Sequence, residues 1–84
     1  MNKNQVKVEI DYEDKKIDLQ ISKQMTLSLL AEKLPETLEV IGIKLPEKFK
    51  LEITNKHIRI DPNVSLEHYP IGNGDQLMVV GEEE

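Results

Sequence analysis

The spacing of the apolar residues changes along the chain, from every second position to the spacing of a helix and back again. Residues 6–12 alternate between apolar and charged side chains, which is the pattern of a β-strand with one buried face. The alternation resumes over residues 17–21 after the polar break at 13–16. The chain is therefore predicted to open with a β-hairpin.

A helix is predicted from Thr26, whose hydroxyl can accept a hydrogen bond from a free N–H group of the first turn. The apolar residues that follow at helical spacing are Leu27, Leu30, Leu34, Leu38 and Ile41. Pro35 lacks an N–H group and its ring clashes with the carbonyl of Ala31, so we expect the helix to kink or restart there. Gly42 is a natural end for the helix.

The second half of the chain predicts three further elements. Residues 49–53 alternate again, and with a turn at Asn55 and Lys56 and a short strand over 58–60 they predict a second hairpin. Residues 65–69 predict one 3₁₀ turn. After the turn signal at 72–75, residues 77–80 are apolar on both faces, which is typical of a strand in the middle of a sheet.

These elements predict an α+β fold in which one helix packs across a mixed sheet of four to five strands. The 84 residues suffice for one domain, 1–84, with residues 1–4 and 81–84 as flexible ends. The predicted core consists of Val6, Val8, Ile10, Ile17, Leu19, Ile21, Leu27, Leu30, Leu34, Leu51, Ile53, Leu66, Ile71, Leu77 and Val79.

Composition excludes several classes of protein. The chain has no cysteine, and its apolar runs are shorter than a membrane span of about 20 residues. No signal sequence opens it, so we expect a cytoplasmic protein. The net charge is −5, and the basic residues are interleaved with acids, which argues against a nucleic-acid partner unless a basic groove assembles in three dimensions.

The segment Leu66-Glu67-His68-Tyr69-Pro70-Ile71 resembles the L-x-x-Y-x-I segment of ubiquitin, in which the tyrosine hydroxyl ties a loop to the backbone. Thr26 falls where the ubiquitin helix begins. The opening strand and the closing residues 69–77 are similar to the YukD/EsaB proteins of type VII (WXG100) secretion systems. The resemblance implies a ubiquitin-like β-grasp fold.

Two departures from ubiquitin bear on function. The chain has no Gly-Gly pair and ends in Gly81-Glu82-Glu83-Glu84, whereas conjugation and sulfur carriage use a C-terminal diglycine. Glu52 aligns with the central isoleucine of the ubiquitin receptor-binding patch, so receptors for that patch are not expected to bind. The glutamates of the tail are interpreted as a solvated end, or alternatively as a contact for a basic partner.

No residue pattern indicates catalysis, a cofactor or a metal site. His57 and His68 are interpreted as surface histidines, because neither has a cysteine or a regularly spaced acid to form a relay or a metal site. Asp75 is interpreted as a turn residue that accepts hydrogen bonds from nearby backbone N–H groups. We therefore expect a non-enzyme with no small-molecule substrate.

Two apolar areas are candidate partner-binding surfaces. Met78 and Val80 alternate with the predicted core of the last strand and so face the opposite side of a central strand. An exposed pair there marks a partner site, unless loops or the tail cover it. Leu45, Phe49 and Ile43 form a second area around Pro46.

The resemblance implies a cytoplasmic accessory or regulatory subunit of a type VII secretion apparatus. Its partners would be the membrane components or the ATPase of that apparatus, without insertion into the membrane. The alternatives are a sulfur carrier or protein modifier, which the missing diglycine disfavours, and a ubiquitin-like scaffold unit of an unrelated complex.

Overall fold

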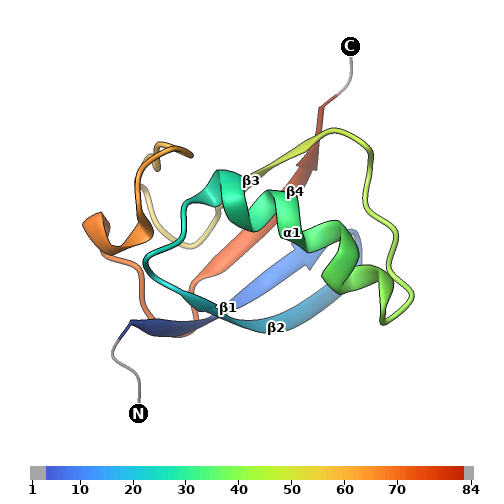
Figure 1. Ribbon diagram of the computed structural model, residues 1–84, viewed down its shortest axis with the longest axis horizontal. Coiled ribbons are helices and arrows are strands. Elements are labelled where there is room, and N and C mark those ends of the chain that lie inside the picture. The colour runs from blue at the N-terminus through green and yellow to red at the C-terminus, as the bar shows by residue number, and fades with distance from the viewer. Residues whose placement is uncertain (1–3, 83–84) are drawn as a thin grey trace.

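The sheet has four strands in the order β2-β1-β4-β3, with the helix α1 across one face (Figure 1). The computed structural model describes residues 4–82. Its elements are β1 (Gln5–Tyr12), β2 (Lys15–Ser22), α1 (Leu27–Glu39), β3 (Phe49–Ile53), the 3₁₀ helix η1 (Leu66–His68) and β4 (Gln76–Gly81). This two-layer α+β arrangement confirms the predicted fold class.

β4 lies between β1 and β3, as its apolar residues on both faces predicted. It runs parallel to β1, with Glu9 opposite Gln76, and antiparallel to β3, with Leu51 opposite Val79. β1 and β2 form the antiparallel hairpin at the start of the chain. The sheet is therefore mixed, and its two edges are β2 and β3.

Most of the predicted core is buried between the sheet and α1. The confirmed members are Val6, Val8, Ile10, Ile21, Leu27, Leu30, Leu34, Leu51, Leu66, Ile71, Leu77 and Val79. Ile17, Leu19 and Ile53 are only partly buried. They lie on the two edge strands, where fewer neighbouring elements cover a side chain.

α1 begins as predicted and runs through Pro35 without restarting. The Thr26 hydroxyl accepts a hydrogen bond from Leu29 N at 3.1 Å. Pro35 is exposed, while Leu34 and Leu38 on either side of it are fully buried. Of the two expected outcomes, a kink or a restart, the restart does not occur, because the packing of these leucines outweighs the hydrogen bond that proline removes.

The end of the helix also explains two residues that we had not placed in the core. Gly42 has a φ of +83°, and its N–H donates to the Glu39 carbonyl at 3.0 Å. Ile43 N donates to the Leu38 carbonyl at 3.0 Å, which completes a Schellman motif. This motif places Ile43 beside Leu38, and both side chains are buried.

The prediction of a second hairpin was wrong, because residues 58–60 form no strand. The chain leaving β3 is bonded to the turn before β4 instead of folding back on β3. Asn55 Oδ1 accepts from Gln76 N at 3.0 Å, and Lys56 Nζ lies 3.0 Å from Asp75 Oδ2. Asn55 also lacks the positive φ expected of a tight hairpin turn.

The hydrogen bond from the loop backbone to the tyrosine hydroxyl, expected from the resemblance, is present. Tyr69 Oη accepts a hydrogen bond from Asp61 N at 2.9 Å. It fixes the loop between β3 and η1 to the segment that follows η1. The predicted 3₁₀ turn over 65–69 is confirmed as η1.

β4 includes Gly81, and the residues that flank the sheet in both segments that we expected to be flexible form backbone hydrogen bonds. The Asn4 carbonyl accepts from Lys23 N, Gly81 is paired with Phe49, and Glu82 N donates to the Lys48 carbonyl at 2.9 Å. The other positions of these two predicted ends, 1–3 and 83–84, lie outside the described residues.

Candidate functional site

The face of the sheet opposite α1, here called the open face, carries the first candidate pair. Leu77 and Val79 of β4 are buried under the helix, so Met78 and Val80 point to the open face. The Met78 side chain is 39% exposed and Val80 is half-buried. Partner binding by this pair stays a prediction.

Charged side chains surround Met78 on the open face. The strand register places it between Asp11 of β1 and Glu52 of β3. Glu52 is paired with Lys50, at 3.2 Å between Oε2 and Nζ, on the exposed surface. The candidate surface is thus a small apolar area with carboxylates on both sides.

Two carboxylates of β1 lie close together on this face. Glu9 Oε2 and Asp11 Oδ1 are buried atoms without a hydrogen-bond partner among the described residues. Asp11 raises the pKa of Glu9, because a protonated Glu9 can donate a hydrogen bond to Asp11. Burial and the nearby negative charges of Asp11 and Asp18 raise it further, while Lys16 opposes them.

The second candidate area is smaller than the sequence suggested. Leu45 and Phe49 are half-buried and pack against the core. Ile43 is only 8% exposed, held in place by the Schellman motif, and is therefore a core residue. Leu45 and Phe49 remain as predicted contacts, beside Pro46 and the end of β4.

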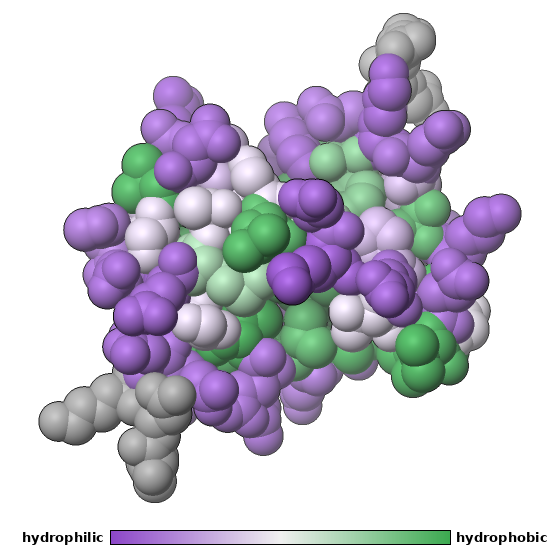
Figure 2. Space-filling view, in the orientation of Figure 1, coloured by the Kyte–Doolittle hydropathy of each residue, from purple (hydrophilic) through white to green (hydrophobic). Residues whose placement is uncertain are grey.

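The sequence did not reveal a groove between α1 and β3, here called the edge groove. It has a volume of about 570 Å³ and is bounded by the first turns of α1, by β3 and by the loop 58–62. Its apolar lining includes Ala31, Phe49, Ile53, Ile58 and Ile60. Figure 2 shows apolar surface beyond the helix, over the region of β3, bordered by hydrophilic side chains.

Asp75 has the structural role that we predicted, in a larger cluster than the sequence indicated. It is 4% exposed and accepts hydrogen bonds from Gly72 N at 2.8 Å and Asn55 Nδ2 at 2.9 Å. Lys56 Nζ lies 3.0 Å from it and also donates to the Pro70 carbonyl. Burial favours the neutral carboxyl, but the hydrogen bonds from Asn55, Gly72 and Lys56 outweigh it and lower the pKa of Asp75.

The two histidines lie at the surface, as the sequence predicted. His57 and His68 are both exposed. Over residues 4–82, no group of three histidine or acidic side chains could hold a metal ion. No helix in the same range combines the length and the apolar character needed to cross a membrane.

The family of this chain follows from its sequence over nearly its whole length. The family model described as "WXG100 protein secretion system (Wss), protein YukD" matches residues 5–79. The chain belongs to this family. The resemblance given by the closing residues 69–77 is thereby confirmed. No curated protein matches the sequence.

Solved structures show the ubiquitin-like fold of this YukD-family chain. A ubiquitin of Caldiarchaeum subterraneum has a TM-score of 0.68 at 14% identity, covering 95% of this chain and 96% of the other. A ubiquitin-like protein of Trypanosoma brucei has a TM-score of 0.65 at 16% identity, covering 98% and 100%. One chain of an ESX-5 inner membrane complex has a TM-score of 0.64 at 14% identity, over 96% of this chain but 22% of that one.

Proposed function

We propose that this protein is a non-conjugating, protein-binding accessory subunit of a type VII secretion apparatus, acting on its cytoplasmic side. The family match over residues 5–79 is the observation that carries the proposal. The ESX-5 inner membrane complex, which contains a domain of the same fold, supports membrane components or the ATPase of the apparatus as partners. The absence of a Gly-Gly pair argues against conjugation.

Met78 and Val80 are the proposed contact for this partner. They lie on the central strand of the open face, which no helix covers among the described residues. Exposed apolar side chains on such a face gain free energy when a partner removes them from water. Leu45 and Phe49, half-buried beside the end of β4, are the second proposed contact.

The test is an affinity pull-down from the native cytoplasm and membrane fraction, with captured proteins identified by mass spectrometry. Met78→Asp places a charge in the proposed contact between two existing carboxylates, so we expect it to abolish capture of the secretion components while the domain stays folded. Leu29→Asp is the matched control, because Leu29 is 40% exposed, compared with 39% for Met78, but lies on α1.

The outcomes separate the function from its surface. If the parent and Leu29→Asp capture a secretion ATPase or membrane component but Met78→Asp does not, the result supports both the proposed function and the open face as the contact. Capture that survives Met78→Asp removes the open face as the contact and leaves the function. An adenylating enzyme, or a covalent adduct through the C-terminus, overturns the function in favour of a carrier.

A further inference from the structure

β3 is an edge strand whose outer row of backbone groups is unpaired. Thr54 N donates to the Gln76 carbonyl at 3.0 Å, and Glu82 N donates to the Lys48 carbonyl at 2.9 Å. These two bonds fix the even-numbered residues of β3 as the ones bonded to β4, since bonded and non-bonded pairs alternate in an antiparallel ladder. The N–H and C=O groups of Phe49, Leu51 and Ile53 therefore point outward, and over residues 4–82 no strand pairs with them.

The loop that forms the far wall of the groove is bonded at both of its ends to other elements. Ser28 N donates to the Pro62 carbonyl at 3.0 Å, and Tyr69 Oη accepts from Asp61 N at 2.9 Å. These bonds fix one end of the loop to α1 and to the residue after η1. Asn55 and Lys56 hold the other end to the turn before β4. The edge groove is thus already formed in the free protein.

The side chains that line the groove have the spacing of a strand. Phe49, Leu51 and Ile53 all lie on the helix side of β3, at every second position. A strand added to β3 would turn alternate side chains into the groove, where Ala31 and Ile58 supply further apolar surface. An extended segment with apolar residues at every second position fits this surface.

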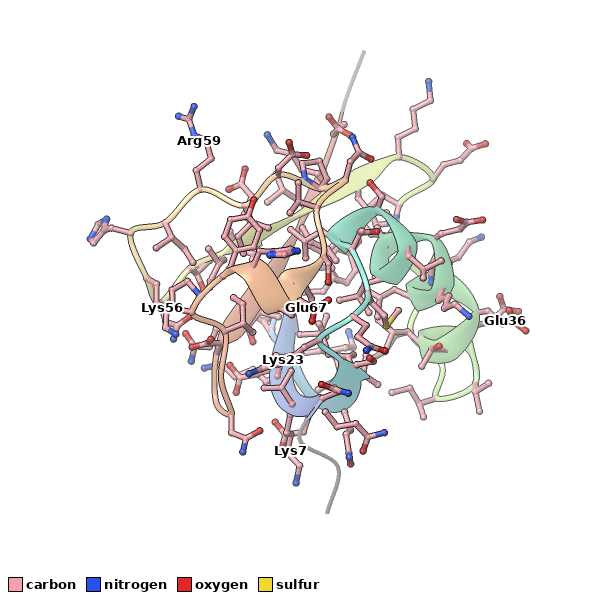
Figure 3. All side chains as sticks on the ribbon, turned by 60° about the vertical axis from the view of Figure 1, so that its left-hand side comes forward. Lys7, Lys23, Glu36, Lys56, Arg59 and Glu67 are labelled. Carbon is pink, nitrogen blue, oxygen red and sulfur yellow. The ribbon has the colours of Figure 1, made fainter. Side chains whose placement is uncertain are left out.

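The charge of the groove selects among such segments. Lys50 and Glu52 alternate with the groove-facing residues of β3, lie on the open face and form an ion pair with each other, so they add no net charge. Arg59 is exposed, and no carboxylate pairs with it over the described range. Figure 3 shows Arg59 pointing away from the body of the protein. Arg59, one of the lining residues, can therefore pair with an acidic side chain of a bound segment next to the apolar residues.

We propose that β3 and the edge groove bind an extended peptide segment of a partner by strand addition. The segment carries aliphatic residues at alternate positions and an acidic residue beside them. The inference rests on the proposed function as a protein-binding module and names a second mode of binding at a different surface from Met78.

The test selects binders from random peptides long enough for one strand, displayed on phage, and follows a selected peptide by NMR. We expect alternating aliphatic residues with a flanking acid. On binding, the N–H groups of Phe49, Leu51 and Ile53 should exchange with solvent at least about tenfold more slowly. Those of Lys50 and Glu52 are already bonded to β4 and should change little.

Matched variants separate the groove from general effects. Ala31→Gln fills the groove and should weaken binding about tenfold, whereas Glu32→Gln, at the next and exposed helix position, should not. Arg59→Glu should weaken the binding of acidic peptides roughly threefold. Lys15→Glu, on the other edge of the sheet, should leave their affinity unchanged. Arg59 is exposed, so its variant is expected to fold even if Ala31→Gln does not.

Four results would overturn the inference: no selected peptide, protection at β4 instead of β3, equal effects of each variant and its control, or protection of β3 without peptide as the protein is concentrated. The last would mean pairing between two copies. Because the secretion pull-down is a separate readout, capture there without peptide binding at β3 removes this inference and leaves the proposed function standing.

Discussion

Replacing Asp75 by alanine should destabilise the fold by about 2–4 kcal/mol. The carboxylate is 4% exposed, so its removal leaves Gly72 N and the Asn55 amide without their acceptor. A buried unsatisfied donor costs about 1–3 kcal/mol, which applies to the half-buried Gly72 N, whereas the amide of the exposed Asn55 can turn to water and adds only about 1 kcal/mol. Lys56 adds little to this sum, because its side chain is one-third exposed and can be solvated.

Urea unfolding of the parent, Asp75→Ala and Asp18→Asn measures this effect. A loss of about 3 kcal/mol lowers the melting temperature of a domain of this size by roughly 15 °C. Asp18 is exposed on β2, so its variant should stay within about 0.5 kcal/mol of the parent. A change equally small in Asp75→Ala would refute the reasoning and indicate that water replaces the carboxylate.

The pH dependence gives a second test of the same cluster. The folded protein lowers the pKa of Asp75, so the ionised carboxylate stabilises the fold above the ordinary aspartate pKa of about 4. This contribution is lost as the pH falls through the lowered pKa. The difference in stability between the parent and Asp75→Asn should therefore shrink in acid, and a difference that stays constant would contradict the hydrogen-bonded carboxylate.

Two further predictions concern single side chains. Tyr69→Phe should cost about 1 kcal/mol in urea unfolding, because Asp61 N loses its acceptor at a site partly open to water, and it should raise hydrogen exchange in the loop after β3. No change in either quantity would mean that the loop is held by its other bonds alone. Glu9→Gln should raise stability at pH 7, because the raised pKa makes an ionised Glu9 unfavourable in the fold. This gain should disappear below the ordinary glutamate pKa, and a gain that persists in strong acid would exclude the carboxylate pair as its cause.

The sequence predicted the elements whose signals are local. The change in apolar spacing identified the first hairpin and α1, and the residues at 77–80 identified the central strand. The helix does not restart at Pro35, because buried leucines on both sides of it hold the helix together, which is a tertiary effect. The strand expected at 58–60 was misjudged for a similar reason, since side chains distant in sequence fix the loop elsewhere.

The candidate surfaces were predictable only in part. Alternation sufficed to place Met78 and Val80 on the face opposite the helix. The edge groove could not be foreseen, because it exists only where an expected strand is missing. The pairing of Glu9 with Asp11 is visible as an i, i+2 spacing, but their lack of donors depends on the neighbouring strands.

The parallel pairing of β1 with β4 has a consequence for biosynthesis. The two central strands are far apart in the sequence, with Glu9 beside Gln76. The sheet cannot close until residues 76–81 have left the ribosome, and contacts of this separation slow folding. The first hairpin and α1 must therefore wait in the nascent chain with their apolar faces uncovered, and this interval is when the protein is most exposed to chaperones and to aggregation.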